Sequence, residues 1–161
     1  MNRQKILDRL KDSGIIAVIR LDGVENLDKI IDALAKGGVQ ALEVTMTTPN
    51  AVAIIRDISF SLSEDFLIGA GTVLNTDTAK EVIDAGAQFV VSPVFKPSII
   101  EIVHQYDKVA ISGAFSPTEI LSAWETGADI VKIFPATVLG PVYFKDIHGP
   151  LPQVKLTPTG G

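Results

Sequence analysis

The sequence lacks several features that would point to particular classes of protein. It contains no cysteine, which excludes disulfides, thiolate metal sites and a thiol nucleophile. Its two histidines, His104 and His148, are expected on the surface, so we expect neither a metal nor a cofactor. Aromatic residues make up 6%, Lys and Arg form no block, and the net charge is −5, so nucleic acid is not an expected partner.

Long apolar runs and an export signal are also absent. No stretch approaches the roughly 18–20 uncharged apolar residues of a membrane span. Residues 1–5 lead into an amphipathic segment and not into the apolar core of a signal peptide. We therefore expect no membrane partner and a cytoplasmic location.

What the sequence does contain is a repeat of short apolar runs, each followed by an amphipathic helical stretch. The runs begin about 20–26 residues apart, which is the length of one βα unit. Apolar strands that alternate with helices predict a parallel sheet covered on both faces. The seven predicted strands are residues 15–20, 40–45, 66–70, 88–92, 108–112, 129–134 and 153–157.

Two architectures fit this repeat, a doubly wound open sheet and a (β/α)8 TIM barrel. The regular unit length, without a dinucleotide fingerprint, favours the barrel. We expect a single, incomplete barrel domain over residues 1–161 that lacks helix 7 (the helix that follows the seventh strand), strand 8 and helix 8. Helices are predicted over 24–36 and 76–85, with start signals at Asn75 and Ser116. Left-handed helix ends are predicted at Gly38, Gly86 and Gly127.

Two charges interrupt the apolar strands and need a reason. Glu43 and Lys132 each lie in an apolar strand, five residues after Gly38 and Gly127, and such residues are rarely fully buried. They belong to the second and sixth strands, which face each other across a barrel. Two interpretations stay open: a buried ion pair that only stabilises the barrel, or a desolvated amine that attacks a carbonyl beside a proton-transferring carboxylate.

Several segments resemble, in order and spacing, the 2-keto-3-deoxy-6-phosphogluconate (KDPG) and 4-hydroxy-2-oxoglutarate (KHG) aldolases over essentially the whole chain. These segments are residues 14–20, 43–49, 68–73, 92–93, 132–135 and 149–161. The resemblance implies a homotrimeric class I aldolase, a lyase that uses a lysine Schiff base and no metal. Its substrate would be a small keto acid: KDPG, cleaved to pyruvate and glyceraldehyde 3-phosphate, and/or KHG, cleaved to pyruvate and glyoxylate.

By motif match, the resemblance implies that Lys132 is the Schiff-base lysine and that Glu43 is the general acid/base. Phe134 and Pro93 match residues that line the pyruvyl pocket, and Thr72 matches one that contacts the keto acid. Turn chemistry alone would also explain Pro93 and Thr72. The phosphate loop of the family matches Thr159, Gly160 and Gly161.

One position departs from the common pattern of the family. Many members carry Arg four residues after the catalytic Glu, where this chain has Thr47. Another branch instead has Arg at the end of strand 1, which matches Arg20. We therefore assign the substrate carboxylate to Arg20, because a guanidinium suits a planar carboxylate. The alternative is an exposed Arg20 paired with Asp22 or Glu25.

This departure leaves the substrate open between KDPG, its galacto epimer (KDPGal) and KHG. A catalytically impaired incomplete barrel, or a non-catalytic fragment used in packing or assembly, is a further alternative. Another pyruvate-lysine enzyme, such as an N-acetylneuraminate lyase or dihydrodipicolinate synthase relative, would use a tyrosine near the lysine. Tyr106 and Tyr143, the only tyrosines, lie in helical contexts, so we discount that alternative.

Overall fold

Seven parallel strands form one sheet in the computed structural model, which describes residues 1–20 and 26–160. The strands pair in sequence order, from β1 at one edge to β7 at the other. They are β1 (Ala17–Ile19), β2 (Ala41–Thr45), β3 (Leu67–Gly71), β4 (Phe89–Val91), β5 (Val109–Ala114), β6 (Ile130–Ile133) and β7 (Leu156–Pro158). All seven predicted strands are confirmed.

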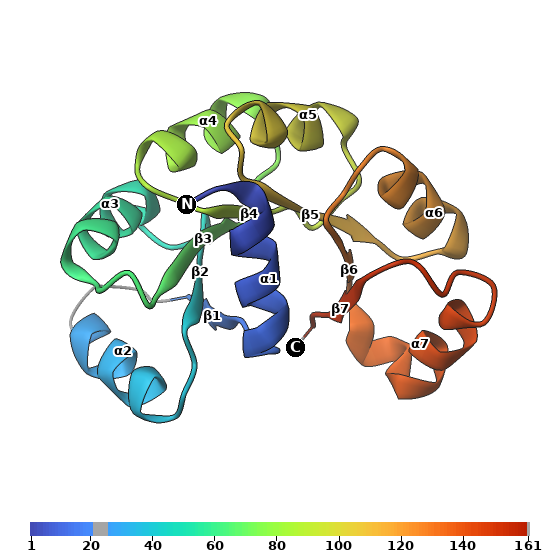
Figure 1. The fold of residues 1–161 in the computed structure, drawn as a ribbon, viewed down its shortest axis with the longest axis horizontal. Coiled ribbons are helices and arrows are strands. Elements are labelled where there is room, and N and C mark those ends of the chain that lie inside the picture. The colour runs from blue at the N-terminus through green and yellow to red at the C-terminus, as the bar shows by residue number, and fades with distance from the viewer. Residues whose placement is uncertain (21–25, 161) are drawn as a thin grey trace.

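Helices cover the outer face of this sheet, which curls into a ring that stays open between β1 and β7 (Figure 1). Sequential order and curling rule out the doubly wound open sheet. The described helices are α1 (Arg3–Ser13), α2 (Leu27–Lys36), α3 (Ala51–Ser61), α4 (Thr76–Asp84), α5 (Pro97–Gln105), α6 (Pro117–Glu125), η1 (Ala136–Val138) and α7 (Gly140–His148). None of them is long and apolar enough to cross a lipid bilayer. Residues 24 and 25 of the predicted helix 24–36 lie outside the described residues.

The predicted helix signals act as expected from their chemistry. The Asn75 side chain accepts a hydrogen bond from a backbone N–H of α4, and Ser116 forms a reciprocal capping box with Glu119 at the start of α6. Where the helices end, the chain turns through positive φ angles of 82°, 112° and 102° at Gly38, Gly86 and Gly127. Glycine reaches this region without steric cost, so each βα unit can turn sharply into its next strand.

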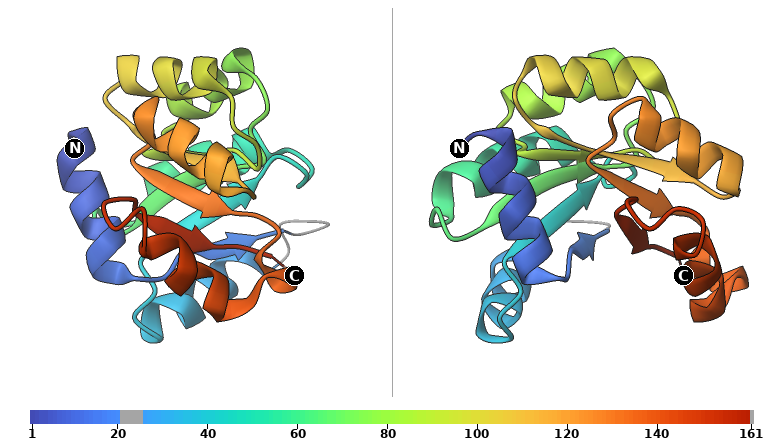
Figure 2. Two further views of the ribbon diagram at one scale, coloured as in Figure 1. Left: turned by 90° about the vertical axis from the view of Figure 1, so that its right-hand side faces the viewer. Right: turned by 45° about the vertical axis from the view of Figure 1, so that its right-hand side comes forward.

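The N-terminal helix α1 closes one end of the barrel. Its apolar side chains Ile6, Leu7 and Leu10 are buried against inward side chains near the starts of the strands, among them Leu67 and Phe89. Figure 2 shows α1 at the end of the sheet where the strands begin. The sequence indicated an amphipathic segment here but not this packing. With that end closed, the part of the barrel that the structure describes is open to a ligand where its strands end and at the gap between β1 and β7.

A buried carboxylate fastens α1 to the barrel. Asp129, 6% exposed, accepts hydrogen bonds from the side chains of Arg3 at 2.8 Å and His104 at 3.1 Å, and from the backbone N–H of Ala110 at 2.9 Å. The expectation of two surface histidines is therefore wrong for His104, which is half-buried; His148 is exposed, at the end of α7. Sequence position alone could not reveal the partner of His104, because Asp129 is 25 residues away.

Candidate active site

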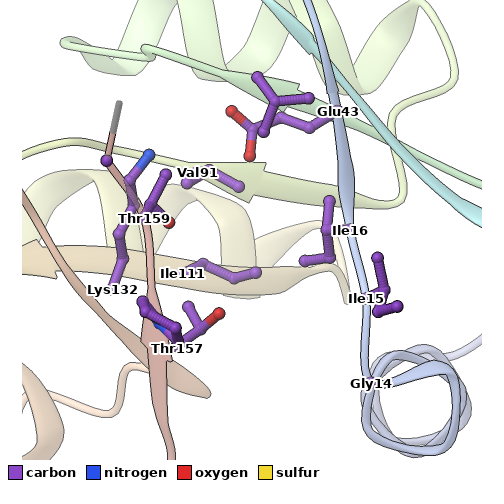
Figure 3. Close-up of a pocket in the computed structure, with 12 residues that line it drawn as sticks. Gly14, Ile15, Ile16, Glu43, Val91, Ile111, Lys132, Thr157 and Thr159 are labelled. Atoms are coloured by element: carbon purple, nitrogen blue, oxygen red, sulfur yellow. The ribbon is translucent and has the colours of Figure 1, made fainter. Parts of the chain in front are cut away.

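Glu43 and Lys132 both point into the barrel, where a charge is uncommon. Period-two alternation puts Glu43 on the inner face of β2, in register with Gly69 of β3. On the other side of the barrel, Lys132 of β6 is in register with Gly113 of β5. Only 4% of Glu43 and 6% of Lys132 is exposed. In Figure 3 the two side chains extend toward the same space from different sides of the ring.

A cavity of about 450 Å³ surrounds the two charges at the end of the barrel where the strands end. Every described residue to which the sequence assigned a site role lines this cavity, namely Arg20, Glu43, Thr72, Pro93, Lys132, Phe134, Thr159 and Gly160. Gly161 lies outside the described residues, as do Asp22 and Glu25, the alternative partners of Arg20. A second cavity of about 320 Å³ adjoins the first at Glu43 and Lys132 and extends toward the gap between β1 and β7 (Figure 3).

Burial drives both charged groups toward their neutral forms. It lowers the pKa of Lys132; the Glu43 carboxylate opposes this shift, and the Arg20 guanidinium adds to it. It also raises the pKa of Glu43, against the attraction of Lys132 and Arg20. No hydrogen bond or ion pair joins Glu43 or Lys132 to another of the described residues. Lys132 Nζ lies over the Phe134 ring, 5.2 Å from its centroid.

The end of β2 and the loops that follow β2 and β3 add hydroxyl groups to the cavity wall. Thr72 has a φ of 59°, a left-handed conformation that a β-branched residue adopts only under strain. Such strain often accompanies a functional position, because the surrounding structure has to maintain it. The hydroxyls of Thr45 and Thr47 are 2.9 Å apart, and both residues line the cavity.

Three lining residues, Val18, Thr45 and Thr47, were not predicted as part of the site. Val18, in β1, lies two residues before Arg20, and Thr45 lies two residues after Glu43 in β2; Thr47 follows in the next loop. Since side chains alternate along a strand, this two-residue spacing could have identified Val18 and Thr45.

Together these features define a barrel enzyme that carries a desolvated amine and a desolvated carboxyl group in one cavity. A neutral amine attacks carbonyl carbon, and a nearby carboxyl group can supply and remove the protons that imine formation requires. Among the residues of known position, no three His, Asp or Glu side chains gather into a group that could hold a metal ion.

Comparison with known proteins agrees with this class. Residues 6–161 match the family model described as KDPG and KHG aldolase. A 2-dehydro-3-deoxy-phosphogluconate aldolase of Haemophilus influenzae is 35% identical over 98% of this chain and 74% of its own length. A probable 2-dehydro-3-deoxy-6-phosphogalactonate aldolase of Rhizobium meliloti is 34% identical over 91% and 70%.

A solved structure extends the similarity to three dimensions. The KDPG aldolase of Legionella pneumophila, with pyruvate captured as a covalent carbinolamine intermediate, has a TM-score of 0.87 and is 33% identical. The alignment covers 97% of this chain and 76% of that one. The chain belongs to the KDPG and KHG aldolase family, and it is an aldolase, a lyase.

Proposed function

We propose that this chain is a Schiff-base aldolase that cleaves KDPG to pyruvate and glyceraldehyde 3-phosphate, and KHG to pyruvate and glyoxylate, with Lys132 as the nucleophile. The observation that carries the proposal is the burial of Lys132 and Glu43 in one cavity with no bond between them. At neutral pH, a larger fraction of such a buried amine is neutral than of a solvent-exposed lysine. Its lone pair is then available to attack the keto carbon.

In the first half-reaction, Lys132 Nζ attacks C2 of the keto acid. The resulting carbinolamine loses the C2 oxygen as water, and Glu43 supplies the proton for that departure. The product is a protonated imine between C2 and Lys132. Because Glu43 and Lys132 share the cavity, one carboxyl group can serve both the addition and the dehydration.

In the second half-reaction, Glu43 removes the proton of the C4 hydroxyl. The C3–C4 bond breaks, its electron pair forms the C2–C3 double bond while the π pair of the imine moves to the nitrogen, and the aldehyde leaves. The enamine that remains takes a proton at C3. Hydrolysis of the imine then releases pyruvate and regenerates the amine, so no external oxidant or reductant is needed.

The cavity wall supplies groups for the rest of the substrate. Arg20 is assigned to the carboxylate, since its guanidinium can bind both oxygens. The apolar faces of Phe134 and Pro93 suit the pyruvyl carbons, and the Thr72 hydroxyl suits a keto or carboxylate oxygen. These roles come from the cavity geometry together with the family motifs.

The phosphate end is assigned to Thr159, Gly160 and Gly161, by motif match. A Cβ atom on Gly160 would lie 3.1 Å from the backbone nitrogens of Ala136 and Thr137 at the start of η1. Glycine at 160 thus allows two backbone segments to approach closely, and the Ala136 N–H donates a hydrogen bond to the Thr159 carbonyl at 2.9 Å. Backbone N–H groups of this loop other than that of Ala136 can then bind a phosphate.

KDPGal is the second candidate substrate, because the chain has Arg20 with Thr47 and resembles the Rhizobium protein named for the galacto epimer. Pyruvate release from KDPG, KDPGal and KHG, compared by kcat/KM, ranks the three. A homotrimer and a cytoplasmic location stay predictions.

Hydride trapping tests the proposed mechanism. Pyruvate and a hydride reductant should add one pyruvate-derived mass to Lys132, located by peptide mass spectrometry. Lys132→Ala should give no adduct, and Glu43→Gln should slow trapping about 10²-fold or more without moving the site. An adduct on another lysine, or none on the folded parent, contradicts the Schiff-base assignment.

A further inference from the structure

Three glycines lie on the inner face of the barrel, two in β3 and one in β5, and each leaves room for a different group. They are Gly69 and Gly71 of β3 and Gly113 of β5. A methyl group on Gly69 would collide with the Phe89 ring, and one on Gly113 would collide with the backbone of Pro93 and Val94. A methyl group on Gly71 would collide with the side chain of Glu43 itself, 2.5 Å from Cδ and 2.8 Å from Cγ.

The backbone at Gly71 does not require glycine. Its φ angle is outside the positive region that the helix-terminating glycines adopt, and its carbonyl accepts an ordinary 2.8 Å hydrogen bond from the backbone N–H of Met46. Any L-residue could adopt this extended conformation. The reason for a glycine here is therefore space. Gly69, on the same strand, also lacks a positive φ and leaves space for the Phe89 ring.

The space above Gly71 also decides where the Glu43 carboxylate lies. Glu43 is in register with Gly69, but its carboxylate lies over Gly71, two residues further toward the open end of the barrel. The Phe89 ring, fully buried, occupies the position over Gly69. No hydrogen bond from a described residue fixes the carboxylate, so packing, together with the attraction of Lys132 and Arg20, directs it toward the cavity that also contains Lys132.

We propose that Gly71 is a positioning residue for the aldolase reaction. Because Gly71 has no side chain, the Glu43 carboxylate can occupy the space over it, and from there it reaches the substrate carbons bound to Lys132. The inference rests on the proposed function. A methyl group at 71 leaves the backbone unstrained but forces the flexible end of Glu43 to move. Displacement of a reacting group by about 1 Å can cost about 10²-fold in rate.

Two measurements on the pyruvate complex distinguish a positioning role of Gly71 from a role in folding. Deuterium uptake at the pyruvate methyl group requires proton removal from C3 of the imine, which depends on where Glu43 lies. The final amount of hydride-trapped Lys132 adduct depends on the amine. For Gly71→Ala we expect deuterium uptake about 100-fold slower, with the final amount of adduct and the thermal midpoint unchanged. Gly69→Ala is the matched control; it should lower the midpoint through Phe89 and leave uptake per folded molecule near that of the parent.

The shorter side chain of Glu43→Asp provides the sharpest test. Aspartate lacks Cδ and the Oε atoms, which lie closest to the new methyl group, and keeps only the more distant contact at Cγ. Gly71→Ala should therefore slow uptake less than about threefold in the Glu43→Asp background. Such strong non-additivity is expected for side chains in direct contact. If Gly71→Ala alone does not fold, folding of the double variant identifies the same collision.

The outcomes distinguish this inference from the proposed function. A parent without an adduct on Lys132 overturns both. A parent with normal adduct and uptake, together with a Gly71→Ala variant that exchanges at the parental rate, overturns the positioning role alone. Equal slowing in the Glu43 and Glu43→Asp backgrounds, or failure of both Gly71→Ala variants to fold, also overturns it, because the loss is then structural.

Discussion

The two ends of the barrel both bury charged groups, but they treat them differently. At the end closed by α1, Asp129 accepts three hydrogen bonds, from Arg3, His104 and the backbone of Ala110. At the open end, Glu43 and Lys132 are buried to a similar degree, yet no hydrogen bond or ion pair from a described residue compensates either of them. One arrangement satisfies its charge, and the other leaves its groups ready to react.

The pKa directions express this difference. Burial opposes ionisation of Asp129, but the hydrogen bonds from His104, Ala110 and Arg3 outweigh it and lower the pKa. For Glu43 burial prevails, and the pKa is raised. Burial by itself is therefore a poor sign of function. Burial without compensating hydrogen bonds, inside a cavity, is the better one.

Arg20 is the third charged residue at the open end, and its removal should produce the largest of the effects compared between the two ends, a loss of pyruvate binding. Arg20→Ala should raise the pyruvate concentration that half-saturates hydride trapping about 10- to 150-fold, because a charge-assisted hydrogen bond is worth about 1.5–3 kcal/mol. Thr47→Ala, on the same cavity wall, is the control. It should change that concentration at most about fivefold, since a neutral hydrogen bond contributes about 1 kcal/mol. Equal half-saturation in Arg20→Ala and the parent would reassign the carboxylate site.

A substitution at the closed end should instead lower the stability of the protein. Asp129→Ala leaves the buried N–H of Ala110 without an acceptor, so we expect a loss of about 1–3 kcal/mol in the free energy of unfolding by urea. The folded fraction should still form the Lys132 adduct. Asp57→Ala, at an exposed position of α3, should change stability by less than about 0.5 kcal/mol. The comparison fails if Asp129→Ala unfolds like the parent or if its folded fraction loses the adduct.

The sequence predicts the charged groups at the open end of the barrel but not the hydrogen-bonded carboxylate at the closed end. The strands, the helix caps and the inward charges Glu43 and Lys132 follow from local periodicity and from the rarity of charges in apolar strands. Asp129 begins an apolar strand, where an acidic residue is ordinarily solvated. Its partners Arg3 and His104 are 126 and 25 residues away, so only the tertiary structure joins them.

Gly71 illustrates the other limit of sequence reasoning. A glycine within a strand signals a close approach by some other group. The Gly-Ala-Gly-Thr segment is a place where such an approach is expected. Local pattern could not tell which group approaches, because the collision is with Glu43 of the adjacent strand.

The smallest expected effect is a difference in pH dependence between the two carboxyl groups. Asp129 has a folded-state pKa below its ordinary 3.8. It therefore contributes stability that is present above that value and is lost as the pH falls through the folded pKa. Glu43 has a folded-state pKa above its ordinary 4.5, so the folded protein binds the proton more readily, and stability rises as the pH falls from the folded pKa toward 4.5.

Urea unfolding of the parent, Asp129→Asn and Glu43→Gln at a series of pH values checks these signs. The advantage of the parent over Asp129→Asn should shrink below pH 3.8, whereas its stability relative to Glu43→Gln should improve as the pH falls toward 4.5. One proton is involved in each case, so neither difference can change by more than about 1.4 kcal/mol per pH unit. If both differences shrink toward acid, Glu43 is compensated in the same way as Asp129, and the distinction between the two ends of the barrel is wrong.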